Sequence, residues 1–66
     1  MNKIEAIQLL NEGKKLTHQL FSEDEFVKMS SEEGVYEFED GARQTSEDFW
    51  KLRTDRTWFN DWKLKD

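Results

Sequence analysis

The absence of cysteine is the feature that most constrains this chain, because the chain has only 66 residues. A domain of this size buries only about 60% of the surface that its unfolded chain exposes. Its core rarely supplies more than roughly 3–5 kcal/mol unless a disulfide, a metal or a partner subunit adds stability. Without cysteine, disulfides and thiolate metal sites are excluded, and a single histidine excludes a multi-histidine zinc site. Self-association is the remaining source of stability, so we expect a homo-oligomer.

Aromatic residues indicate that the chain is folded in spite of its polar composition. The hydrophobic fraction is 35% and the mean hydropathy is -1.02, values typical of partly disordered chains. However, 14% of the residues are aromatic, and such large side chains can build a core in a short chain. We therefore expect a single domain over residues 1–66. The sequence has neither an apolar stretch that would span a bilayer nor the apolar core of a signal peptide, which predicts a cytoplasmic protein without membrane contact.

The order of periodic segments predicts an α+β fold. A capping-box spacing and an apolar face predict a helix over residues 2–12, which Gly13 ends. Apolar residues then alternate with polar ones, and the predicted strands cover residues 16–21, 25–29 and 35–39, with a less regular one around 58–64. A second helix is predicted from residue 45 or 46 to about 53. The connections are too short for parallel crossovers. We thus expect the N-terminal helix to pack on a three- to four-stranded antiparallel sheet, with a short second helix.

Acidic residues are concentrated in the middle of the chain. The net charge is -5, and residues 23–48 hold ten acids against two basic residues, whereas both ends are slightly basic. An acidic chain is repelled by nucleic acid, so direct nucleic-acid binding is not expected. The acidic segment either forms a solvated face or imitates a phosphate backbone and binds a protein. The candidates for protein binding are Glu23, Asp24, Glu25, Glu32 and Glu33.

No catalytic motif is present, and we expect neither an enzyme nor a cofactor. The chain lacks a glycine-rich phosphate loop and a nucleophile elbow. His18 is the only histidine, and it lies on the apolar side of the alternation between Leu16 and Leu20. Such a histidine is more often buried and hydrogen-bonded than catalytic.

The C-terminal third combines aromatic and basic residues and is the second candidate site. Ring faces stack on planar bases, each stack contributing about 1–3 kcal/mol, and arginine binds phosphate oxygens through paired hydrogen bonds. The alternative is that these rings build the core, which we expect for Trp50 and Trp62. Trp58 and Phe59 would lie on opposite faces of an extended segment, leaving one of them for an interface or a ligand. The predicted ligand-binding residues of this third are Arg53, Arg56, Trp58 and Phe59.

Two stretches resemble a widespread family of small phage proteins. The segment from Glu5 to His18 reads EAIQLLNEGKKLTH and is similar to the family pattern EALxxLKxGKKVxR. Phe21 stands where that pattern usually has an aromatic residue, and His18 stands where it has a basic one. The resemblance therefore adds Phe21 and His18 to the predicted ligand-binding residues. The segment from Asn60 to Leu64 reads NDWKL and resembles the strand that closes those proteins. The family includes the second class of phage anti-Thoeris defence proteins.

The resemblance implies a cytoplasmic homo-oligomer that acts against host defence. Members of the anti-Thoeris group sequester cyclic nucleotide or cyclic ADP-ribose-type immune signals at subunit interfaces without cleaving them. Our first hypothesis is a phage counter-defence protein of this kind. The second is an acidic inhibitor that binds a host defence protein, such as a CRISPR nuclease. The third is a phage protein with a structural role.

Overall fold

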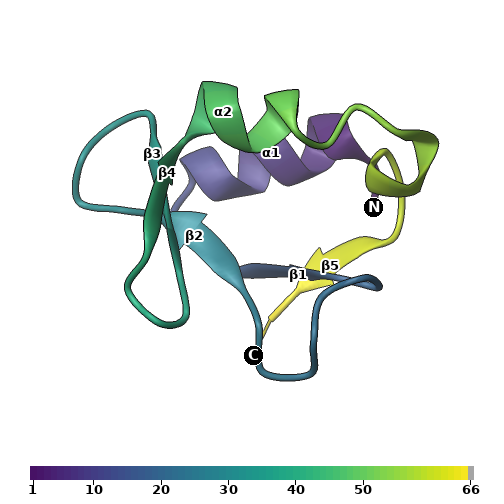
Figure 1. The fold of residues 1–66 in the computed structure, drawn as a ribbon, viewed down its shortest axis with the longest axis horizontal. Coiled ribbons are helices and arrows are strands. Elements are labelled where there is room, and N and C mark those ends of the chain that lie inside the picture. Colours follow the sequence, from purple (N-terminus) through teal and green to yellow (C-terminus); the bar gives the residue numbers. More distant parts are fainter. Residues whose placement is uncertain (66) are drawn as a thin grey trace.

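The computed structural model describes residues 1–65, in which five strands and two α-helices form one α+β unit (Figure 1). The elements follow in the order α1 (Lys3–Asn11), β1 (Leu16–His18), β2 (Val27–Met29), β3 (Val35–Phe38), β4 (Arg43–Thr45), α2 (Ser46–Lys51), a 3-10 turn η1 (Arg56–Trp58) and β5 (Trp62–Leu64). None of the helices in the described part of the chain is long and apolar enough to cross a membrane.

The helix α1 begins and ends at the signals that the sequence predicts. The side chain of Asn2 accepts a hydrogen bond from the Glu5 N–H at 2.9 Å, and the Glu5 carboxylate accepts one from the Asn2 N–H at 3.0 Å. This capping box satisfies two backbone donors that the first turn leaves free. At the other end, Gly13 adopts a φ of 88° and donates to the Leu10 carbonyl at 3.0 Å. Local chemistry alone therefore sets both ends of α1.

The sheet is antiparallel and has five strands, one more than the upper limit that we predict. The strand order is β4-β3-β2-β1-β5, so the first four strands form a meander and β5 returns to lie beside β1. The additional strand is β4, which pairs with β3 from Val35↔Thr45 to Glu37↔Arg43. Its residues are polar and lack the apolar alternation by which the other strands are recognised.

Both helices cover one face of the sheet, and the core lies between these two layers (Figure 1). Each element except β4 and η1 contributes at least one buried apolar side chain. The buried set is Ala6, Leu10, Leu16, Val27, Tyr36, Phe49 and Trp62. The opposite face carries a row of charges in register, Lys28, Glu37 and Arg43, of which the last two form an ion pair at 3.3 Å.

The segment before β5 is not the extended strand that we predict. Trp58 ends the 3-10 turn η1, which begins where the Asp55 carboxylate accepts a hydrogen bond from the Thr57 N–H at 2.9 Å. Phe59 follows it in helical conformation. The expectation that Trp58 and Phe59 point to opposite faces of a strand is therefore wrong, because a polar cap in the preceding connection starts a turn instead.

Candidate functional site

An aromatic cluster brings the C-terminal segment against β1. It consists of His18, Phe21, Trp58 and Trp62. The His18 ring centroid lies 4.5 Å from that of Trp58 and 4.6 Å from that of Trp62. The Phe21 ring lies 5.9 Å from that of Trp58 and meets Trp62 edge-on at 5.7 Å. These distances are those of packed aromatic pairs. Three of the predicted ligand-binding residues therefore contact one another.

His18 is buried within this cluster and has both ring nitrogens engaged. It is 3% exposed. Its Nδ1 accepts a hydrogen bond from the Leu20 N–H at 3.0 Å, so its Nε2, 2.7 Å from the Asn60 carbonyl oxygen, is the nitrogen that carries the proton. The prediction of a buried, hydrogen-bonded histidine is confirmed. The contact with Asn60 also ties β1 to the turn before β5.

Arg53 is held between two rings instead of extending into solvent. Its guanidinium carbon lies 4.0 Å from the Phe49 ring centroid and 5.0 Å from that of Trp58. Its Nη1 donates to the Phe49 carbonyl, in the last turn of α2, at 3.1 Å. Burial lowers the pKa of Arg53, and the negative charge of Glu25 acts in the opposite direction. A cation at this place stabilises the end of α2, which gives Arg53 a structural role.

Arg56 and Phe59 lie outside the cluster. Both are exposed: Arg56 begins η1, and Phe59, which is 44% exposed, directly follows it. Phe59 contacts the N-terminal segment through its backbone, since its carbonyl oxygen accepts a hydrogen bond from the Lys3 N–H at 2.6 Å. The structure thus brings His18, Phe21, Arg53 and Trp58 together and leaves these two residues at the surface.

A hollow of about 600 Å³ lies beside the aromatic cluster, between the edge strand β5 and the loop after β1. Polar side chains, the Phe21 ring and two lysines line it. The lining residues are Thr17, His18, Gln19, Phe21, Ser22, Glu23, Lys63, Leu64 and Lys65.

The two lysines of this hollow are absent from the predicted site. Lys63 pairs with Thr17 across the sheet, and the Lys65 N–H continues the ladder by donating to the Lys15 carbonyl at 2.9 Å. The Lys65 ammonium donates to the Glu23 carbonyl oxygen at 2.9 Å. Residues two apart in a strand share a face. The alternation of lysine and leucine from 63 to 65 is therefore the signal that could have identified them.

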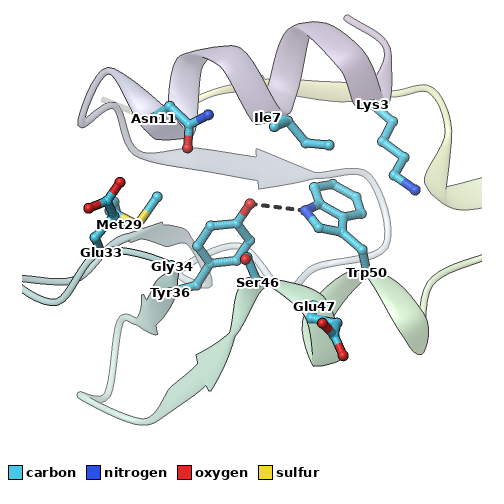
Figure 2. A pocket seen from close by; sticks show the side chains of 10 residues that line it. All are labelled: Lys3, Ile7, Asn11, Met29, Glu33, Gly34, Tyr36, Ser46, Glu47 and Trp50. Carbon is cyan, nitrogen blue, oxygen red and sulfur yellow. Dashed lines mark hydrogen bonds between the residues drawn. The ribbon is translucent and has the colours of Figure 1, made fainter.

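A second concavity is a groove of about 540 Å³ between α1 and α2 (Figure 2). The residues Lys3, Ile7 and Asn11 recur every fourth position of α1 and line the groove from that helix. The other lining residues come from β2, the β2–β3 connection, β3 and α2, and they are Met29, Glu33, Gly34, Tyr36, Ser46, Glu47 and Trp50. Nothing in the sequence pattern identifies this groove, because it depends on how the two helices sit on the sheet.

A buried hydrogen bond fixes the floor of this groove. The indole N–H of Trp50 donates to the Tyr36 hydroxyl at 3.0 Å (Figure 2). Tyr36 is 1% exposed, and burial raises its pKa, an effect that the bond from Trp50 partly offsets. The hydroxyl therefore stays neutral at ordinary pH, and it is pre-oriented by the indole. Trp62 is fully buried as we predict, whereas Trp50 is half-buried and lines the groove.

The acids predicted to bind a protein lie in two separate connections. Glu23, Asp24 and Glu25 lie in the connection that enters β2, and Glu32 and Glu33 lie in the connection that leaves it. The two groups are thus at opposite ends of one strand. Glu33 instead lies at the same groove as Glu47. Within residues 1–65, no three acidic or histidine side chains converge in a way that would hold a metal ion.

The fold defines a small α+β domain with a one-sided antiparallel sheet. Comparison with known proteins finds no match, whether among family models, curated proteins or solved structures. The resemblance to the phage family stays a prediction.

Proposed function

We propose that the protein is a non-catalytic binding protein that sequesters a small phosphate-bearing ligand of the cyclic nucleotide type. The observation that carries this proposal is the hollow beside β5, where two lysine side chains and a phenylalanine ring line one space of about 600 Å³. Ligand sites of drug-sized molecules have volumes of roughly 300–1,000 Å³. The hollow therefore has room for a nucleotide.

The chemistry of the hollow suits a ligand with both a ring and phosphates. Lys63 and Lys65 lie on one face, and ammonium groups bind phosphate as point charges. The ring of Phe21 offers an apolar wall, and the exposed Gln19 amide supplies both a donor and an acceptor. Glu23 also lines the hollow and favours a ligand whose phosphates lie on the β5 side. In this proposal the phosphates are bound by Lys63 and Lys65, and not by Arg53 as the sequence predicts.

The biological setting of the proposal rests on the resemblance to the phage family. We place the protein in the cytoplasm of an infected host cell, where it acts against defence as a homo-oligomer. Sequestration needs no reacting group, which fits the engagement of both nitrogens of His18. The bound signal would leave the protein chemically unchanged.

The test is calorimetric titration with a panel of cyclic dinucleotides and cyclic ADP-ribose isomers. We expect one of them to bind and to be recovered intact after the protein is heat-denatured. The double variant Lys63→Gln/Lys65→Gln should bind it at least about tenfold more weakly, because two charge-assisted contacts are lost. The matched control is Lys14→Gln/Lys51→Gln, which removes the same charge from exposed positions outside the hollow. Equal affinities of the two double variants, or no binding by any member of the panel, would overturn the proposal.

A further inference from the structure

The groove between α1 and α2 has a chemistry opposite to that of the hollow beside β5. Its floor is apolar and aromatic, from Ile7, Met29, Tyr36 and Trp50 (Figure 2). The hydrogen bond between Trp50 and Tyr36 holds the two rings in place before any partner arrives. An apolar site that is rigid in advance loses little entropy when a side chain enters it. The floor thus favours insertion of a bulky apolar side chain.

Two carboxylates border this apolar floor. Glu33 comes from the β2–β3 connection and Glu47 from the first turn of α2, and within the described residues neither forms an ion pair. Across the groove, the ammonium of Lys3 lies 5.1 Å from the Trp50 ring centroid. This contact shows that the indole face accepts a cation. Anionic ligands are disfavoured here, because the carboxylates would repel phosphate.

We propose that this groove is a docking site for a basic, amphipathic segment of a partner protein. The segment would place a leucine-like side chain over Ile7 and Trp50 and would direct lysine or arginine side chains to Glu33 and Glu47. Charge complementarity of this kind sets both the partner and the orientation of docking. The proposal is independent of the proposed ligand site, since the two share no lining residue.

The basic and apolar run that includes the end of β5 does not fit this role. Lys63, Leu64 and Lys65 have the required composition, and Leu64 is 53% exposed. However, pairing of Leu64 with Leu16 holds that run in the sheet, so its backbone is not available to enter between two helices. The run Lys51, Leu52 and Arg53 does not fit it either, because Leu52 is 71% exposed but Arg53 is held between the Phe49 and Trp58 rings. The observations therefore favour a segment of another protein over a second copy.

The test uses fluorescein-labelled synthetic peptides and fluorescence anisotropy. The probe contains a pair of leucines flanked by lysines, and the comparison peptide has glutamates in place of the lysines. We expect saturable binding of the lysine peptide that weakens with salt, and no binding of the glutamate peptide. The variant Glu33→Lys/Glu47→Lys should weaken binding at least about tenfold. The control Glu12→Lys/Asp24→Lys makes the same charge change at exposed positions outside the groove and the hollow, and it should keep the affinity within about twofold.

A second pair of variants tests the apolar floor. Ile7→Ser removes a lining side chain and should weaken peptide binding severalfold, whereas Ile4→Ser changes a residue of the same helix that is 69% exposed and outside the groove. Circular dichroism checks that each variant is folded. Equal weakening by both charge variants would reveal nonspecific attraction and overturn the proposal. So would light scattering that shows the groove variants dissociating an oligomer, since a second copy would then be the occupant.

Discussion

Tyr36 is the chain's single tyrosine, and its burial makes the protein sensitive to alkali. Because its pKa is raised in the folded state, the unfolded chain releases this proton at a lower pH than the folded protein does. The stability that Tyr36 contributes is therefore fully present below about pH 10, the ordinary value for tyrosine, and is lost as pH rises through the folded-state pKa. We expect the free energy of unfolding, measured with urea at a series of pH values, to fall above pH 10.

The variant Tyr36→Phe tests the two roles of the hydroxyl, which accepts the hydrogen bond from Trp50 and ionises at alkaline pH. It should lower the free energy of unfolding at neutral pH by about 1 kcal/mol, because the Trp50 indole N–H loses its acceptor. It should also reduce the fall of the free energy of unfolding above pH 10, because the ionisation of Tyr36 no longer contributes to it. Tyrosinate absorbance of the folded wild-type protein reports on Tyr36 alone, and a titration midpoint at or below that of free tyrosine would contradict the argument.

The sequence predicted several residues of the aromatic cluster and the neighbouring Arg53, but it did not predict their environments. Aromatic and basic side chains in the C-terminal third indicate a cluster, and His18, Phe21 and Trp58 do lie together. What decides the role of His18 is the Asn60 carbonyl, 42 residues away. Arg53 likewise contacts a second ring, that of Trp58, because the chain after α2 folds back toward it. Long-range partners of this kind leave no local pattern.

At the scale of elements, the sequence predicts the helix ends that are set by hydrogen bonds between neighbouring residues. The ends of α1 follow from its caps, and Thr45 begins α2 as expected by accepting a hydrogen bond from the Asp48 N–H at 3.1 Å. In contrast, β4 exists because β3 lies beside it, and its own residues carry no strand pattern. The sequence therefore predicts helices with strong caps better than edge strands formed by pairing.

At Gly13, after the end of α1, the energetic cost of a side chain in the left-handed backbone conformation can be measured. At Gly13 the φ of 88° disfavours any residue with a side chain, yet a Cβ there would meet no atom within 4 Å. Gly13→Ala should therefore lower the free energy of unfolding by about 1 kcal/mol through backbone strain alone. Urea unfolding should show a lower midpoint with an unchanged slope.

Gly13→Asn is the control for this change, because asparagine tolerates the left-handed conformation better than alanine does. It should lose clearly less stability than Gly13→Ala. Equal losses in the two variants would mean that the glycine is needed for some reason other than its φ.

At the scale of the whole molecule, a single side chain connects the two candidate sites. Trp62 is 1% exposed and packs against rings on both sides of the core. Its ring centroid lies 4.6 to 6.2 Å from those of His18, Trp50, Phe21, Trp58 and Phe49. Its indole N–H donates to the Trp58 carbonyl at 2.8 Å. Trp62 thus supports the groove through Trp50 and the hollow through Phe21.

The size of the chain makes this position critical. Replacing a buried tryptophan with alanine costs about 3–5 kcal/mol, and the core of a chain of this length supplies roughly 3–5 kcal/mol in total. We expect Trp62→Ala to be largely unfolded by circular dichroism and Trp62→Phe to fold with reduced stability. Trp58→Ala, at the half-buried edge of the same cluster, should remain folded. If Trp62→Ala instead unfolded at the same urea concentration as Trp58→Ala, the core would not be centred on Trp62. The groove and the hollow would then have to be supported independently.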